Sequence, residues 1–154
     1  MPLRDRLSAA LKDAMKAREA ERTSTLRLIN AAIKDRDIAA RSADGGAEDG
    51  VGDAEIMAIL GKMVKQRQES ARIYEEGGRL ELAEKELAEV RVIEEFLPRQ
   101  LTAAEIAAAI DAAIAETGAG SIRDMGRVMA ALKARHTGQM DFGAVGPMVK
   151  DRLA

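Results

Sequence analysis

The chain of 154 residues contains no cysteine, no tryptophan and one histidine, and its remaining aromatic residues are one tyrosine and two phenylalanines. Without cysteine it can form no disulfide framework, no thiolate metal site and no cysteine nucleophile. One histidine cannot supply a multi-histidine metal site within a single chain. So few aromatic rings also argue against RNA readers that stack several bases on exposed side chains. The absences exclude many enzyme classes, and we predict neither a metal ion nor a cofactor.

Charge and hydropathy indicate which partners and which cell compartment to expect. The formal net charge is −2, which gives the chain as a whole no attraction to nucleic acid or to an anionic membrane. Residues 1–41 hold ten basic and six acidic residues and a net charge of +4, residues 42–97 hold seven and fourteen (−7), and residues 98–154 hold seven and six (+1). No stretch reaches the roughly 18 apolar residues of a membrane span, and the charged start of the sequence is unlike a signal peptide. We therefore expect a cytoplasmic protein without membrane association.

Apolar residues recur every three or four positions along the chain, which predicts an all-α fold. Four helices are expected before residue 98. They cover residues 3 to about 20, a helix capped by Thr23 or Ser24 that fades near Arg41, a helix capped by Asp53 that ends at Gly77-Gly78, and residues 79–97. Met15, Ile73 and Leu80 belong to the predicted apolar stripes, and the Gly-rich, acidic residues 42–52 predict a flexible loop.

Three shorter helices are expected after Pro98, which stops helix propagation. Thr102 and Glu105 match a capping box, and the helix that they open ends near Gly118. Ser121 is the expected cap of the next helix, and Asp141, after the break at Gly138, is the expected cap of the last one. The sequence thus predicts two domains, a four-helix N-terminal domain over residues 1–97 and a small three-helix domain over residues 98–154.

The sequence contains no nucleotide-binding or hydrolase motif. A phosphate-binding GxxxxGK[ST] loop, a GxGxxG fingerprint and a GxSxG nucleophile elbow are all missing. His136 can contact a phosphate or act as a base, or it can simply end a helix beside Arg135, where the helix dipole favours a cation. The glutamates between residues 75 and 95 lack the neighbouring histidines of a di-metal site and indicate a solvated helix face.

Two basic clusters are candidate binding sites. The first consists of Arg123, Arg127, Lys133 and Arg135 on the predicted sixth helix, where Gly126 would allow close approach; the second follows the third helix from Lys62 to Arg72. Either cluster can bind phosphates, or it can be ordinary surface charge. The polar stretch from Lys65 to Ser70 interrupts an apolar stripe. It either lies beyond the edge of the core or lines a groove between the domains, for which we predict Lys62, Lys65, Gln66, Glu69 and Tyr74.

Several segments, taken in order, resemble the signatures of the YqeY-like proteins of the GatB/YqeY family. They are Leu26–Arg36, Lys62–Ser70 with Ile73-Tyr74 and Gly77–Arg79, Ala83–Glu86, Glu95–Leu101 and Asp124–Met129. The resemblance covers nearly the whole chain and implies a two-domain helical fold. It also implies kinship with the helical tail of GatB, a subunit of the glutamine-dependent amidotransferase that corrects misacylated tRNA. In that enzyme the tail helps to hold tRNA, while other domains carry out the chemistry.

Three functions follow as hypotheses. The first is an accessory module that binds tRNA, an amidotransferase or another translation-related partner, with residues 123–135 contacting phosphates. The second is a helical protein-interaction module without a nucleic-acid role, which the acidic block 42–97 favours. The third is a carbon–nitrogen ligase with glutamine as the amido donor, as the family label implies. The chain lacks a cysteine nucleophile, and its five serines are scattered, so we name no catalytic residue and leave the enzyme question open.

Overall fold

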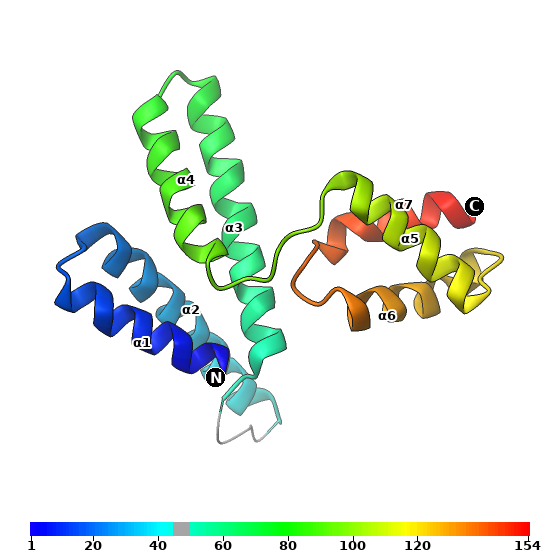
Figure 1. Ribbon diagram of the computed structural model, residues 1–154, viewed down its shortest axis with the longest axis horizontal. Coiled ribbons are helices and arrows are strands. Elements are labelled where there is room, and N and C mark those ends of the chain that lie inside the picture. Colours follow the sequence, from blue (N-terminus) through cyan, green and yellow to red (C-terminus); the bar gives the residue numbers. More distant parts are fainter. Residues whose placement is uncertain (45–49) are drawn as a thin grey trace. The chain divides into compact units, whose positions relative to one another are not determined.

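The computed structural model describes residues 1–44 and 50–154 (Figure 1). Within these ranges all the regular secondary structure is helical, which confirms the predicted all-α fold. The elements are α1 (Leu3–Lys16), α2 (Ala20–Asp44), α3 (Asp53–Glu76), α4 (Leu80–Glu94), α5 (Ala103–Thr117), the 3₁₀ turn η1 (Ile122–Asp124), α6 (Met125–Arg135) and α7 (Phe142–Leu153). The chain divides into two compact units, Met1–Leu97 and Pro98–Ala154. Among the described helices, none is both long and apolar enough to cross a membrane.

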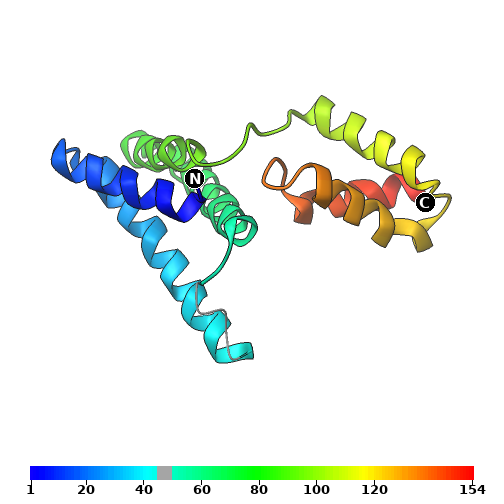
Figure 2. The ribbon, with the colours of Figure 1, turned by 60° about the horizontal axis from the view of Figure 1, so that its bottom comes forward.

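The N-terminal unit consists of two helical hairpins, α1–α2 and α3–α4, which pack on each other (Figures 1 and 2). Its core is built from aliphatic side chains of all four helices, including the fully buried Leu7, Leu26, Ile29, Ile56, Leu60 and Ile93. Beyond Met63 the α3–α4 hairpin extends past this core and is closed by small buried residues such as Ala71 and Ala83. Among the described helices of the N-terminal unit, no third one packs on this distal part, and the predicted stripe residues Ile73 and Leu80 are 55% and 67% exposed.

The turn between α1 and α2 corrects the predicted start of the second helix. Arg18 adopts a left-handed conformation with φ of 57°, and the N–H of Glu19 donates to the carbonyl of Ala14 at 3.0 Å. This hydrogen bond closes α1 at Lys16. Met15, a residue of the predicted apolar stripe, is half exposed. Helix α2 therefore begins at Ala20, and the predicted caps Thr23 and Ser24 lie inside the helix.

The start of α3 corrects a second capping prediction. The N-cap position is occupied by Gly52, and no side chain caps the helix. The carboxylate of Asp53 instead accepts a hydrogen bond of 3.1 Å from the N–H of Leu3, the first residue of α1. Asp53 therefore satisfies one of the free N–H groups of a different helix, which joins the beginnings of α1 and α3.

A polar clamp fixes the chain just before α3. Both guanidinium Nη atoms of Arg4 donate to the carboxylate of Asp37, at 3.0 and 2.9 Å, and Nη2 also donates to the carbonyl of Val51 at 3.0 Å. The N–H of Val51 donates to Asp37 at 2.9 Å. Gly50, with φ of 81°, passes so close that an added Cβ would lie 2.7 Å from both Arg4 and Asp37. Of the predicted loop 42–52, residues 42–44 are the end of α2, residues 45–49 lie outside the described residues, and residues 50–52 are held by this clamp.

The C-terminal unit is formed by α5, η1, α6 and α7 around a core of its own. Its fully buried residues are Ile110, Val128, Leu132, Val145 and Val149. The predicted capping box is present, because Thr102 accepts from the N–H of Glu105 while Glu105 accepts from the N–H of Thr102. Gly118 ends α5 with φ of 67°, and Asp141 caps α7 by accepting from Gly143.

The predicted cap at Ser121 is wrong. Ser121 precedes η1, makes no capping hydrogen bond, and is separated from the start of α6 by the 3₁₀ turn. The carboxylate of Asp124 holds this turn by accepting from the N–H of Gly120 at 2.9 Å. A 3₁₀ turn at a helix start shifts the α-helical hydrogen bonding by one turn, and the Ser121 hydroxyl is then too early in the sequence to act as a cap.

Candidate functional site

Arg127, the central residue of the predicted basic cluster, is engaged within the C-terminal unit. Its guanidinium lies 2.6 Å from the carboxylate of Asp124 and donates to the carbonyl of Thr117, the last residue of α5, at 3.1 Å. The N–H of Gly120 and, after it, the Arg127 guanidinium hold the pKa of Asp124 below its ordinary value. A cation at the C-terminal end of a helix also interacts favourably with the helix dipole. Arg127 thus joins the end of α5 to the beginning of α6.

Arg135 lies two turns further along α6 and forms an ion pair with Glu116, also on α5. Residues eight apart on a helix point within about 80° of each other, so both arginines are directed to the same neighbouring helix. Lys133 lies on the opposite flank of the buried stripe formed by Val128 and Leu132, because it is about 160° from Arg135 around the helix. The structure therefore does not gather the cluster on one face of α6.

Arg123 and Gly126 complete the predicted cluster. Arg123 lies in η1, is exposed and forms no ion pair with any described residue. Gly126 is exposed in the first turn of α6, and an added Cβ would meet nothing within 4 Å. The open space leaves room for a ligand beside this turn, but nothing in the fold itself requires glycine there.

The basic residues of the C-terminal unit fall into two groups. Four arginines form ion pairs inside the unit: Arg99 with Glu105, Arg127 with Asp124, Arg135 with Glu116 and Arg152 with Asp111. Arg123, Lys133 and Lys150 are exposed and form no ion pair among the described residues. These three cations have no carboxylate partner among the described residues, so an external anion can bind them without displacing one.

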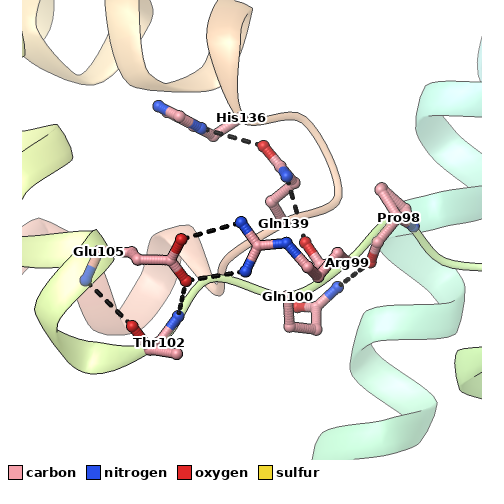
Figure 3. Close-up of polar contacts among 7 residues, drawn as sticks. All are labelled: Pro98, Arg99, Gln100, Thr102, Glu105, His136 and Gln139. Carbon is pink, nitrogen blue, oxygen red and sulfur yellow. Dashed lines mark hydrogen bonds and ion pairs between the residues drawn. The ribbon is translucent and has the colours of Figure 1, made fainter.

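The segment that follows Pro98 is held by the predicted capping box together with side chains for which the sequence had indicated no contact (Figure 3). Arg99 donates to both carboxylate oxygens of Glu105, each at 2.8 Å. This guanidinium, with the N–H of Thr102, lowers the pKa of Glu105 to about 2. Glu105 therefore has two roles. It caps the start of α5 through Thr102, and it holds the preceding segment through Arg99.

The loop between α6 and α7 completes the attachment of this segment. The side-chain amide of Gln139 donates to the carbonyl of Arg99 at 3.1 Å, and the N–H of Leu101 donates to the carbonyl of Gln139 at 2.9 Å. Gln100 donates to the carbonyl of Gly138 at 2.6 Å. Residues 99–101 thus belong structurally to the C-terminal unit. The only sequence signal for this role is their place in the Glu95–Leu101 signature.

His136 ends α6, and its Nδ1 lies 3.0 Å from the side-chain oxygen of Gln139 (Figure 3). The amide nitrogen of Gln139 is already used as a donor to Arg99, so its oxygen must accept and the imidazole Nδ1 must carry a proton. Both the neutral Nδ1–H tautomer and the imidazolium meet this requirement. His136 therefore occupies the helix-end position predicted as one of its two interpretations, with a bracing contact to the loop.

In the N-terminal unit, the polar stretch of α3 has two distinct sides. Arg67 points toward α4, where its Nε lies 3.0 Å from Glu89, and both side chains are less than one-fifth exposed. Arg72 is on the outer side, in exposed ion pairs with Glu69 at 2.5 Å and with Glu76 at 2.6 Å. Arg67 and Arg72 are therefore occupied by internal carboxylates, which weakens the case for a phosphate site along α3.

The residues predicted for a groove are mostly on one side of α3. Lys62, Lys65, Gln66 and Glu69 are exposed and share the outer side, whereas Tyr74 is half-buried and displaced around the helix. The groove itself stays a prediction. Across residues 1–44 and 50–154, His, Asp and Glu side chains form no group of three or more that could hold a metal ion.

The chain matches one protein family model and shows similarity to two curated fungal proteins. The family model described as Yqey-like protein matches residues 4–153. A curated relative from Clavispora lusitaniae, Altered inheritance of mitochondria protein 41, is 38% identical over 91 residues, which cover 59% of this chain and 49% of the relative. Uncharacterized protein C22F3.15 from Schizosaccharomyces pombe is 28% identical over 88 residues, covering 57% of this chain and 66% of that protein. The matched part thus spans about half to two thirds of these relatives.

Proposed function

The chain belongs to the YqeY-like family, and from this membership we propose that it is a helical binding module whose C-terminal unit contacts tRNA as an accessory to an amidotransferase or another translation-related partner. The kinship with the GatB tail implied by the sequence signatures supports this proposal. We also propose that the protein is cytoplasmic, as expected from the sequence.

The observation that carries the proposal is the division of the basic residues in the C-terminal unit. Four arginines form ion pairs within the unit, whereas Arg123, Lys133 and Lys150 are exposed and form no ion pair with a described residue. Exposed cations of this kind bind the phosphate backbone without reading base sequence. The scarcity of aromatic side chains agrees with recognition by charge and shape rather than by stacking. We propose Arg123 and Lys133 as the phosphate contacts, with Arg127 and Arg135 as positioning residues that hold α6 against α5.

Titration of fluorescent tRNA with the full chain tests this proposal. Lys133→Glu and Arg123→Glu are each expected to weaken binding by about tenfold at moderate salt and to reduce the salt slope by about one. Lys85→Glu makes the same charge change on exposed α4 and is the matched control, with binding expected to stay within about twofold. Absence of tRNA binding by the wild-type chain at low salt, or equal losses in all three variants, would overturn the proposal.

A second candidate function, a protein-interaction module without a nucleic-acid role, is favoured by a separate observation. The distal end of the α3–α4 hairpin exposes Ile73, Leu80 and Leu82, within a segment of net charge −7. Exposed apolar side chains surrounded by charge are typical of protein-binding surfaces. Capture from a lysate with and without nuclease separates the two functions: loss of the captured partner on nuclease treatment supports the tRNA proposal, and its retention supports this candidate.

The amide-forming activity implied by the family label is assayed directly by incubating the pure chain with glutamine, ATP and misacylated tRNA. Because the chain has no cysteine nucleophile and no phosphate-binding loop motif, we expect no turnover. Turnover by the isolated chain would show that it supplies a nucleophile of another kind.

A further inference from the structure

The outer side of α3 carries a regular row of five residues, and the core of the N-terminal unit explains only the first of them, Ile59. Positions 59, 62, 66, 69 and 73 are separated by alternating steps of three and four, which places them along one side of the helix. Lys62, Gln66 and Glu69 are exposed, Ile73 is 55% exposed, and Ile59 lies half-buried at the edge of the core. We call these five residues the α3 row.

The residues of the α3 row match those of a second copy of the row that runs in the opposite direction. Gln66 is at the centre, and Ile59 and Ile73 lie seven residues to either side, about 10 Å away along the axis. Lys62 lies four residues before the centre and Glu69 three residues after it, so a reversed copy brings a lysine and a glutamate to nearly the same level. An antiparallel arrangement thus pairs isoleucine with isoleucine, lysine with glutamate and glutamine with glutamine.

We propose that the α3 row is an interface for a second copy of this chain, packed antiparallel about a two-fold axis that passes by Gln66. Such an interface is isologous, so each complementary contact occurs twice. The charges can take part in it: Lys62 forms no ion pair among the described residues, and Glu69 pairs with Arg72 on the surface, where its carboxylate can also accept from a lysine of the second copy. A seam of about four helical turns is shorter than a standard interface, so the dimer is weak and depends on protein concentration.

Crosslinking tests the position of the axis, and the absence of cysteine in the chain makes the test clean. A residue beside a two-fold axis meets its own copy, so Gln66→Cys is expected to form a disulfide-linked dimer under mild oxidation. Lys85→Cys introduces a thiol at another exposed position, on α4, as a control. We expect Gln66→Cys to crosslink at least about tenfold faster. Equal rates for the two variants would overturn the proposed axis.

Charge exchange tests the pairing between Lys62 and Glu69. Lys62→Glu and Glu69→Lys each place like charges opposite one another, and each is expected to raise the dimer dissociation constant by about tenfold in sedimentation experiments. The double variant restores opposite charges and is expected to dimerise as the wild type does. Lys34→Glu on exposed α2 is the control, and thermal unfolding verifies that all variants are folded. A wild-type chain that is monomeric at every concentration, or a double variant no better than the single ones, would overturn the proposal.

Discussion

The guanidinium of Arg67 on α3 reaches across to Glu89 on α4, with 3.0 Å between Nε and Oε2, and also donates to the carbonyl of Met63 at 3.2 Å. The pair lies where the polar stretch 65–70 interrupts the apolar stripe of α3. It therefore joins the two helices at a level that offers few apolar contacts. Because both side chains are largely shielded from water, their interaction is screened less than that of a surface pair.

We expect a double-mutant cycle on Arg67 and Glu89 to give a coupling energy of about 1–2 kcal/mol. Arg67→Ala and Glu89→Ala each leave a shielded charge without its partner, which costs more than removal of both. Urea unfolding of the two single variants and the double variant measures the coupling. Arg91 and Glu84, both more than 60% exposed and 2.6 Å apart, provide the control cycle, with an expected coupling below about 0.5 kcal/mol. Equal coupling in the two cycles would contradict the role of burial.

Gly50 and Gly52 lie on either side of Val51, and we expect alanine substitutions at these two positions to affect stability differently because only Gly50 touches the Arg4–Asp37 clamp. Gly50→Ala forces a side chain into a left-handed conformation and places Cβ 2.7 Å from Arg4 and Asp37. We expect a loss of at least about 2 kcal/mol in unfolding free energy, measured by urea denaturation. Gly52→Ala is the matched control, because Gly52 has extended backbone and an added Cβ would meet nothing within 4 Å. If the two variants were equally stable, the clamp would not be rigid.

The prediction of helices from sequence succeeded where the signal is local. The Thr102–Glu105 capping box, the stop at Gly77-Gly78 and the cap at Asp141 depend only on neighbouring residues, and all three are observed. The caps predicted at Asp53 and Ser121 failed because tertiary contacts and a 3₁₀ turn decide them.

The candidate site was less predictable for the same reason. A list of basic residues in the sequence does not show which of them a carboxylate on another helix will neutralise. Arg135 pairs with Glu116 on α5, and Arg127 donates to the carbonyl of Thr117 at the end of α5, whereas Lys133, between them in sequence, has no ion pair among the described residues. The internal roles of Arg99 and Gln139 likewise depend on contacts between segments about 40 residues apart.

Glu105 gives the C-terminal unit a defined acid sensitivity. Its pKa is about 2 because of Arg99 and Thr102, and it rises to the ordinary value of about 4.3 in the unfolded chain. A lowered folded-state pKa contributes stability above the unfolded pKa, and that contribution is lost as the pH falls from about 4.3 toward 2. In thermal unfolding followed across this range, we expect Glu105→Gln to show a smaller fall in Tm than the wild type. Glu81→Gln, at an exposed position on α4, is the control, and an unchanged slope for Glu105→Gln would refute the prediction.

Gln139 is expected to control the order of residues 99–101. Gln139→Ala removes the donor to the carbonyl of Arg99 and the acceptor for His136. Loss of about one net hydrogen bond should accelerate exchange of the Leu101 amide by about tenfold, measured by hydrogen–deuterium exchange. Gln68→Ala, at an exposed position of α3, is expected to leave this exchange rate unchanged. Equal protection in wild type and Gln139→Ala would show that backbone bonds alone hold the segment.

The two buried cores have no residue in common among the described part of the chain. Substitutions in one core therefore add independently to substitutions in the other, so each half can accumulate sequence change on its own. A chain of this kind can change residues of its C-terminal core without endangering the N-terminal helices. Selection can then act on substitutions in the two units separately, although both units belong to one polypeptide.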